Sequence, residues 1–330
     1  MRFPEFSGEW DSFKLVELGK FIGGGTPSSS NLSFWTGSIP WISSSDIKED
    51  NINNISISRY ITEDAIEKSA TKYCPAPVIL IVSRVGVGKV ALSHTSLCTS
   101  QDFCNIIDIK CHPVFLSYNL LRTMKRKSRE VQGTSIKGIT SDELQKIRVF
   151  IPKNKDEQNK ISNLLTLLDE RIVTQNKIID KLQSLINGIA QNVARNNKPN
   201  IRLSECLECS SSTLQESDVC ENGTYPVYGA NGIVGYLDNY NTEKEAVYII
   251  KDGSGVGTVS YVTGKCSATG TLNTLQAKEG YSLQYLYYML KVFNFEPYKT
   301  GMAIPHIYFK DYGKAKIFCP SYTEQLKYAR

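Results

Sequence analysis

The stretch that decides the fold covers residues 156–195, which read DEQNKISNLLTLLDERIVTQNKIIDKLQSLINGIAQNVAR. Its apolar residues recur at alternating spacings of four and three, as the a and d positions of a coiled-coil heptad do. At 1.5 Å per residue such a helix spans about 60 Å, so the pattern predicts a spacer helix whose seam needs a partner helix. The expected interface residues are Leu165, Leu168, Ile172, Gln175, Ile179, Leu182, Ile186, Ile189 and Val193. The alternative is one amphipathic helix packed on a globular core, although helices in globular proteins average only about a dozen residues.

The segments on the two sides of this helix resemble each other. Motifs in the first segment recur about 168 residues later with almost no drift in register, which indicates a duplicated domain rather than a short repeat. The matching pairs are 86–90 (GVGKV) with 255–259 (GVGTV), 133–139 with 301–307, and 150–152 (FIP) with 318–320 (FCP).

We therefore predict an α/β (α+β) fold of two mixed, strand-rich domains separated by the spacer helix. In the first copy, apolar runs predict strands at 78–82 and 85–92 around a tight turn at Ser83-Arg84, and a helix over 115–127. The predicted boundaries are 1–152 for the first domain, 153–197 for the spacer, 198–319 for the second domain and 320–330 for the start of a second spacer helix. Because the sequence stops at Arg330, that second helix is expected to be truncated.

Composition points to a soluble, cytoplasmic chain without membrane contact. Hydrophobic residues make up 41% and charged residues 22% of the 330 residues, which is ordinary for a globular protein. No apolar run approaches the roughly 18 residues of a membrane span, and the N-terminus lacks the apolar core of a signal peptide. Nine scattered cysteines suit a reducing compartment. A net charge of +5 permits nucleic-acid binding only through a local basic surface.

Several motifs that could carry catalysis are incomplete. Residues 21–25 (FIGGG) fit the F-x-G-x-G pattern of methyl-donor sites, but no helical segment follows them. Residues 253–257 lack the Lys-Ser/Thr of a phosphate-binding loop. Cys206 and Cys209 form a lone C-x-x-C without a second pair at zinc-ligand spacing. We therefore predict that this chain has no catalytic residues and no metal site of its own.

The loops of both copies are rich in side chains that can read base edges, which requires forked donors and acceptors on a rigid scaffold. For each of these residues the alternative role is turn capping, or strand packing for the tyrosines. The candidates in the first copy are Thr26, Ser28, Ser43, Ser44, Asp46, Arg84, Lys89, Gln101, Thr134 and Lys137. Those in the second are Tyr225, Tyr228, Asn231, Lys251, Asp252, Ser254, Thr269, Thr271 and His306.

A basic run closes the helix predicted at 115–127. It consists of Lys125, Arg126 and Lys127, followed by Arg129. Such a cluster is suited to phosphate contacts with nucleic acid. The alternative is a solvated helix end.

With the duplication and the spacer, these motifs resemble the specificity (S) subunits of type I restriction–modification enzymes over essentially the whole chain. In the first domain the resemblance rests on residues 24–28 (GGTPS), 35–41 (W-x-G-x-I-P-W) and Asp46. In the second it rests on residues 225–232 (YPVYGANG) with Gly235-Tyr236. The spacer adds residues 151–152 (IP), 157–158 (EQ) and 168–172 (LDERI).

The resemblance implies a non-catalytic subunit with two target-recognition domains, each reading one half of a bipartite site in double-stranded DNA. It implies that the spacer sets the gap between the half-sites and docks methyltransferase (M) subunits, which methylate adenine, while a restriction (R) subunit completes the complex. S-adenosylmethionine, ATP and Mg²⁺ would then belong to the partner subunits, and the exposed seam would also allow a homodimer. The competing hypotheses are a coiled-coil assembly scaffold that does not read DNA and a stand-alone enzyme.

Overall fold

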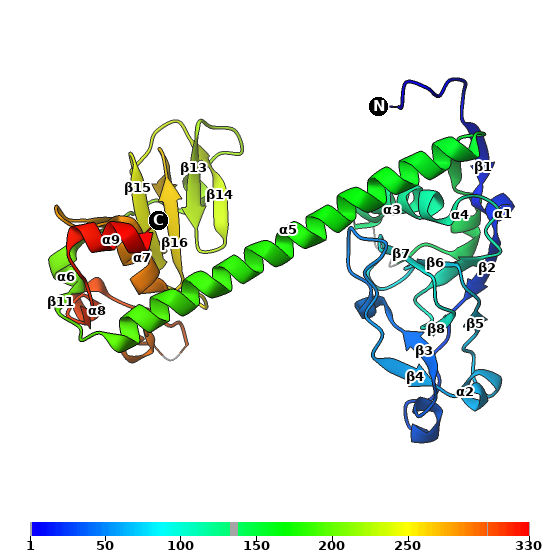
Figure 1. The fold of residues 1–330 in the computed structure, drawn as a ribbon, viewed down its shortest axis with the longest axis horizontal. Helices are drawn as coiled ribbons and strands as arrows, with labels where there is room; N and C mark the ends of the chain where they lie inside the picture. The colour runs from blue at the N-terminus through cyan, green and yellow to red at the C-terminus, as the bar shows by residue number, and fades with distance from the viewer. Residues whose placement is uncertain (1, 133–137, 302, 330) are drawn as a thin grey trace. The chain divides into compact units, whose positions relative to one another are not determined.

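The computed structural model describes residues 2–132, 138–301 and 303–329, without the side chains of residues 130–132. The chain folds into two compact units, residues 1–175 and 176–330, and each is described by itself (Figure 1). The helix α5 (Lys155–Asn196) passes from the first unit into the second. Its bounds confirm the spacer helix expected at 156–195.

The first domain is built on a four-stranded antiparallel sheet. Its strands lie in the order β2-β9-β6-β7, and every residue of β6, β7 and β9 is buried. The helix α3 (Pro113–Gln132) covers one face of this sheet and packs Leu116, Leu120 and Met124 into the core. The strands are β2 (Lys20–Gly23), β6 (Val78–Ile81), β7 (Val90–Ser93) and β9 (Cys104–Ile107).

A second sheet in the first domain has the order β4-β3-β8-β5, with β3 parallel to β8. Its strands are β3 (Ile39–Ile42), β4 (Arg59–Ile61), β5 (Tyr73–Cys74) and β8 (Leu97–Thr99). A separate pair, β1 (Asp11–Lys14) with β10 (Arg148–Ile151), leads into α5. The short helices are α1 (Leu15–Leu18), η1 (Leu32–Trp35), η2 (Ser44–Asp46), α2 (Glu63–Glu67) and α4 (Ser141–Lys146).

The second domain repeats this arrangement. Its sheets have the orders β12-β18-β15-β16 and β14-β13-β17, again with one parallel pair, β13 with β17. The strands are β11 (Ile201–Arg202), β12 (Leu207–Ser211), β13 (Tyr225–Gly229), β14 (Gly232–Leu237), β15 (Glu245–Ile250), β16 (Val259–Thr263), β17 (Ser267–Ala268), β18 (Leu272–Ala277) and β19 (Lys316–Ile317). The helices are α6 (Leu203–Cys206), η3 (Glu216–Asp218), α7 (Leu283–Lys291), η4 (Glu296–Tyr298), α8 (Phe309–Tyr312) and α9 (Tyr322–Ala329).

Equivalent backbone hydrogen bonds confirm the duplication residue by residue. In the first domain Ile139 N donates to Ser83 O at 2.7 Å; in the second, Ile307 N donates to Lys251 O at 3.0 Å. The two donors and the two acceptors are both 168 positions apart in the sequence. The motif pairs found in the sequence therefore mark structurally equivalent positions in two copies of one domain.

Two local predictions differ from the structure. Residues 85–89 belong to a turn and not to a strand, since β7 begins only at Val90. Gly86 (φ 85°) and Gly88 (φ 114°) adopt left-handed backbone conformations that a regular strand does not contain. The helix predicted at 115–127 is longer and continues to Gln132. Within the described residues, every helix is too short or too polar to cross a membrane.

Candidate nucleic-acid interface

The glycine-rich loop after β2 is held against the core of the first domain. Gly25 N donates to Thr99 O at 2.8 Å, and Trp41 Nε1 donates to Gly25 O at 3.0 Å. A Cβ added at Gly24 would lie 2.0 Å from Ser100 O, so this close approach of two backbones requires glycine. The glycines thus fix the position of Thr26, the next residue with a functional side chain.

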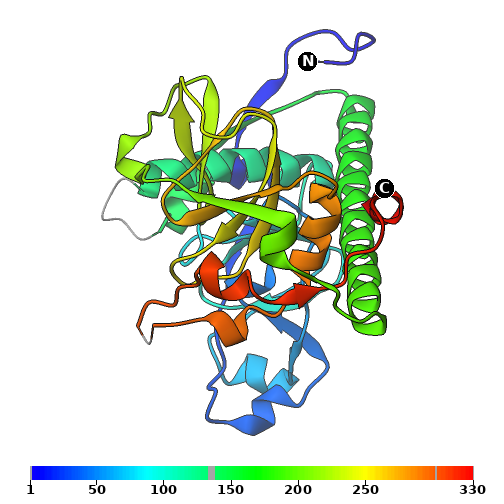
Figure 2. The ribbon, with the colours of Figure 1, turned by 90° about the vertical axis from the view of Figure 1, so that its left-hand side faces the viewer.

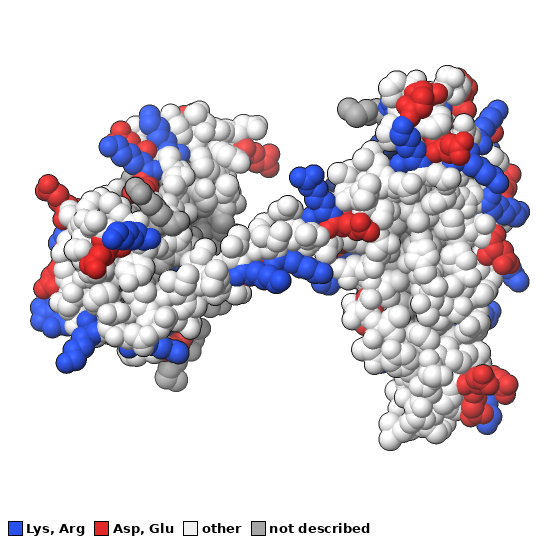
Figure 3. Space-filling model, in the orientation of Figure 1, with Lys and Arg blue, Asp and Glu red and all other residues white. Residues whose placement is uncertain are grey.

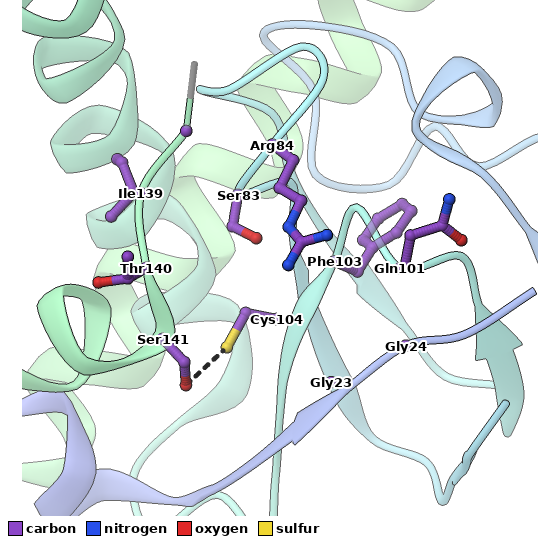
Figure 4. A pocket seen from close by; sticks show the side chains of 11 residues that line it. Gly23, Gly24, Ser83, Arg84, Gln101, Phe103, Cys104, Ile139, Thr140 and Ser141 are labelled. Atoms are coloured by element: carbon purple, nitrogen blue, oxygen red, sulfur yellow. Dashed lines mark hydrogen bonds between the residues drawn. The ribbon is translucent and has the colours of Figure 1, made fainter. Parts of the chain in front are cut away.

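Gly23 and Gly24 line a hollow of about 650 Å³ in the first domain, and Thr26 contacts it through Gln101. The Thr26 hydroxyl donates to Oε1 of Gln101, which lines the hollow together with Arg84. Figure 4 shows the side chains of Arg84 and Gln101 on one side and those of Thr140 and Ser141 on another. Three of the predicted candidates, Thr26, Arg84 and Gln101, are therefore brought together from separate loops.

The backbone holds Arg84 firmly while its side chain stays exposed. Ser83 N and Arg84 N both donate to Asp102 O, at 2.8 and 3.3 Å. No carboxylate among the described residues forms an ion pair with Arg84, so its five guanidinium N–H donors are available. An exposed fork on a rigid loop is the type of group that recognises a guanine edge.

A second group in the first domain centres on a residue that sequence reasoning missed. Arg59 Nη2 donates to Ser43 Oγ at 2.8 Å and to the carboxylate of Asp46, and its guanidinium lies 4.5 Å from the centre of the Trp41 ring. Ser43 and Asp46 also form the capping box of η2, so turn capping accounts for their described contacts. Arg59, whose side chain is 39% exposed, is the outward-facing charge of this group.

Lys89 contacts the Arg59 group through the backbone of Ser44, another candidate. Its Nζ donates to Ser44 O at 3.2 Å. The candidate Ser28 lies in the exposed loop beyond Thr26 and contacts Ser30, Oγ to Oγ at 2.7 Å. Thr134 and Lys137 lie outside the described residues.

In the second domain, backbone hydrogen bonds attach the loop after β15 to two other segments of the domain. Lys251 N donates to Thr271 O at 3.0 Å, and Gly253 N donates to Pro305 O at 3.0 Å. Asp252 and His306 form an antiparallel bridge. The candidates Lys251, Asp252, Ser254, Thr271 and His306 therefore belong to one cluster, at the position equivalent to Ser83 and Arg84.

The hairpin between β13 and β14 adjoins this cluster. Thr269 N donates to Tyr228 O at 2.9 Å, and the Thr269 hydroxyl contacts that of Thr271 at 2.8 Å. Thr269 is only 1% exposed, and Tyr228 packs on the core around Tyr248. Both therefore serve packing in this structure, whereas Asn231 at the hairpin tip is exposed.

Tyr225 takes part in an aromatic and cationic group at the start of β13. Its ring lies 5.2 Å from that of Tyr240, and Lys265 Nζ lies 4.7 Å from the Tyr240 ring centre. This arrangement matches the packing role considered for the tyrosines. The parallel pairing of β3 with β8 matches that of β13 with β17, so β3 is equivalent to β13 and Pro40 is equivalent to Pro226. The sequence motifs did not reveal this correspondence.

The predicted phosphate contacts lie on the C-terminal half of α3. Lys125 Nζ pairs with Asp50 Oδ1 at 2.7 Å. Arg126 and Arg129 line a hollow of about 670 Å³, together with Arg122 and Arg148, which sequence reasoning missed. Lys127 is not among the residues lining this hollow.

Cys206 and Cys209 are placed as packing residues. Burial raises the pKa of the Cys206 thiol to about 12 and that of Cys209 to about 11, so both keep their protons at neutral pH. Over the described part of the chain, no group of three His, Cys, Asp or Glu side chains is arranged to hold a metal ion.

The helix-interface candidates on α5 are mostly exposed. Among them, Ile172 is 58%, Ile179 50% and Leu182 52% exposed. Val193 differs, because it packs with Ala190 into the core of the second domain. The predicted seam therefore ends before Val193.

Comparison with known proteins identifies relatives of both domains. The chain is 33% identical over 186 residues to the type I restriction enzyme MjaIX specificity subunit of Methanocaldococcus jannaschii, covering 53% of this chain and 42% of that protein. It is 32% identical over 203 residues to the EcoR124I/EcoR124II specificity subunit of Escherichia coli, covering 59% and 46%. In these two matches the chain spans less than half the length of the relative. A match to the Escherichia coli EcoprrI specificity subunit, at 23% identity, covers 96% of this chain and 85% of the relative.

The fold is also similar to that of a solved structure. The S subunit of a type I restriction–modification system from M. genitalium superimposes with a TM-score of 0.64 at 19% identity, covering 100% of this chain and 90% of that one. A family model described as the type I restriction modification DNA specificity domain matches residues 7–184 and 199–330. Because this match covers both copies of the duplicated domain, the chain belongs to the family of type I restriction–modification DNA specificity domains.

Proposed function

We propose that this chain recognises DNA for a type I restriction–modification complex, with each domain reading one half of a bipartite target. The observation that carries the proposal is the equivalence of the two loops after β6 and β15. Both are held by the same backbone hydrogen bonds, to Ser83 O and Lys251 O, and both present exposed or half-buried polar side chains. Two copies of one rigid scaffold with different loop side chains can read two different sequences.

In the first domain, Arg84 and Gln101 offer complementary donors for base reading. Arginine forms a bidentate pair with guanine O6 and N7, while glutamine reads adenine or donates to other acceptors in the major groove. Because the Thr26 hydroxyl occupies Oε1 of Gln101, the amide N–H groups of Gln101 remain available as donors. In the second domain we assign the corresponding role to Lys251, Asp252 and His306.

We further propose that α5 docks partner subunits. Its exposed apolar residues are not confined to the a and d positions, since Leu164, Ile178 and Leu185 at the g position are 44%, 44% and 59% exposed. A stripe on a, d and g is wider than a two-helix seam and suits contact with more than one helix. Figure 3 shows mostly uncharged atoms along the middle of α5, with Lys and Arg below it and both acidic and basic side chains near the first domain.

The expected partners of this surface are methyltransferase subunits or the α5 helix of a second copy, with a restriction subunit added to the complex. In this proposal the chain forms and breaks no covalent bond. S-adenosylmethionine serves adenine methylation in the methyltransferase subunits, and ATP with Mg²⁺ serves the restriction subunit.

Methylome sequencing of a host with and without this gene tests the proposed function. Loss of one bipartite adenine-methylation motif is the expected result and would name the target. A gel-shift with that target and a shuffled duplex at two salt concentrations separates DNA reading from a scaffold role, since phosphate-dependent binding weakens steeply with salt. An unchanged methylome together with no binding to either duplex would refute the proposal.

A further inference from the structure

An arginine pocket lies between α3 and β10 of the first domain. Arg122, Arg126 and Arg129 come from α3 and Arg148 from β10, around a hollow of about 670 Å³. Their spacing on α3, four and then three residues, places the three α3 arginines on one face of the helix. None of the described residues that line the hollow is acidic.

The stability of the fold does not account for this concentration of charge. Like charges four residues apart on a helix repel each other. Within the described residues, Arg122, Arg126 and Arg129 have no ion pair, and Arg148 donates only to Ser12 Oγ, at 3.1 Å. The helix dipole stabilises cations in the last turn of a helix, which does not reach as far back as Arg122. The cluster is therefore a site that an anion would stabilise.

The duplication shows that arginines at these positions are not needed to fold the domain. His112 N and Ser282 N, at the starts of α3 and α7, make equivalent bonds to Gln158 and Gln325, which sets the register between the two helices. α7 has nine residues and α3 has twenty. The extra helical segment, residues 122–132, carries all three α3 arginines and also buries Met124 in the core. In the second domain residues 292–298 take its place without an arginine, and Phe295 packs near Gly257 as Ser128 packs near Gly88.

The extra segment extends toward the loops that are candidates for reading DNA. Lys125 pairs with Asp50 at 2.7 Å, and a Cβ on Gly88 would lie 3.1 Å from the Ser128 side chain. By contrast, the N-terminal half of α3 is attached to α5, where Tyr118 Oη donates to Asp169 Oδ2 at 2.8 Å. Figure 2 shows α3 leading away from α5. Arg126 and Arg129 thus lie on the part of α3 that extends toward the candidate DNA-reading loops. The lining of the hollow also includes Trp10, whose Nε1 donates to Glu157 Oε1 in the first turn of α5 at 3.1 Å.

We propose that the arginine pocket binds phosphodiester groups of the DNA backbone beside the half-site read by the first domain. This inference rests on the proposed function. Guanidinium groups bind phosphate oxygens through two parallel N–H donors. From Arg122 to Arg129 the helix rises about 10 Å, which corresponds to roughly three phosphates of one strand along the duplex axis. Such contacts give affinity and orientation without reading sequence.

The test is the salt dependence of DNA binding by the full chain, measured with the methylome-defined target and a shuffled duplex. The variant R122Q/R126Q/R129Q should weaken binding to both duplexes alike. The slope of log K against log salt should become shallower by about 0.9 for each phosphate that the variant no longer neutralises. Preference for the target over the shuffled duplex should remain.

Two further variants serve as controls. K177Q/K181Q/K198Q removes the same charge from exposed positions outside the pocket and should keep the wild-type slope. R122K/R126K/R129K keeps the charge but not the forked donors; it should keep most of the slope and bind both duplexes somewhat more weakly than wild type.

The outcomes separate this inference from the proposed function. If wild type prefers its target and the folded triple glutamine variant keeps the wild-type slope, the arginine pocket is not a phosphate site, while the proposed function stands. If that variant binds DNA normally but no longer co-purifies with the methyltransferase subunit, the pocket docks protein and the inference is overturned. If wild type binds neither duplex, both fail.

Discussion

Gln158 and Gln325 occupy equivalent positions in the two copies, one in the first turn of α5 and the other in the first turn of α9. Each is buried and each closes the same pair of hydrogen bonds. Gln158 accepts from His112 N at 3.0 Å and donates to Pro152 O at 2.8 Å. Gln325 accepts from Ser282 N and donates to Pro320 O, both at 2.9 Å. In each domain one glutamine side chain thus links the start of the long helix, α3 or α7, to the proline that precedes the next helix, α5 or α9.

Replacing Gln158 by Ala should lower the free energy of unfolding of the first domain. The change leaves His112 N and Pro152 O without their side-chain partner in a buried setting, which typically costs about 1–3 kcal/mol per group. Urea denaturation of the full chain measures the effect, and the exposed Gln183→Ala variant on the same helix is the control. Equal stability of the two variants would mean that water replaces the amide at no cost.

Exchanging residues 1–150 for the first domain of another family member should change one half of the DNA target only. The expectation follows from the separate cores of the two domains and from their equivalent loops. Methylome sequencing of the chimera checks it. A change in both halves, or in neither, would contradict the assignment of one half-site to each domain.

Within the first domain, Arg84→Ala should relax specificity at one base pair while leaving the second half-site unchanged. Removing a bidentate guanine pair costs about 1–3 kcal/mol of discrimination. Competition binding with single-base variants of the target measures this. Arg195→Ala provides a matched control, because Arg195 is equally cationic and exposed but lies on the spacer helix, outside the candidate loops. Uniform weakening across all bases by Arg84→Ala would instead assign that residue to a phosphate.

The spacer helix and the duplication could be predicted because they depend on local periodicity and on motifs repeated at one offset. Of the arginine pocket, Arg126 and Arg129 were among the predicted phosphate contacts. Arg148 could not be predicted, since it reaches the α3 arginines only through the packing of β10 beside α3. Nor could the pairing of Arg59 with Asp46, which join at a tertiary contact. The 85–92 strand was mispredicted because its valines suit a strand, whereas the left-handed Gly86 and Gly88 impose a turn.

Acid should weaken the contact between α3 and α5 at His112. Burial lowers the pKa of this imidazole below its usual value of 6.5, and its Nδ1 lies 3.0 Å from Ser162 Oγ. As pH falls, the His112 side chain therefore takes up a proton in the unfolded chain before it does so in the folded chain. The contribution of neutral His112 to the free energy of unfolding is fully present above about pH 6.5 and is lost as pH falls below it. The unfolding temperature should fall less between pH 7.5 and pH 5.5 in His112→Asn than in wild type. An equal loss in both would assign the effect to other groups.

The exposed stripe of α5 should drive association of the purified chain or its binding to a methyltransferase subunit. Fully burying one Leu or Ile side chain contributes about 1.5–3 kcal/mol, so contacts at Leu168, Ile172, Ile179 and Leu182 alone can hold a helix pair together. Gln175 lies among them and, as a polar seam residue, can fix the register. Sedimentation should show wild type assembling at tens of micromolar, or doing so once the methyltransferase subunit is added, while Ile172→Glu/Ile179→Glu does not. A matched variant, Asn176→Glu/Gln183→Glu, adds the same charge outside the a, d and g positions and should assemble as wild type does. The expectation fails if wild type stays monomeric with and without the methyltransferase subunit, or if the seam variant assembles equally well.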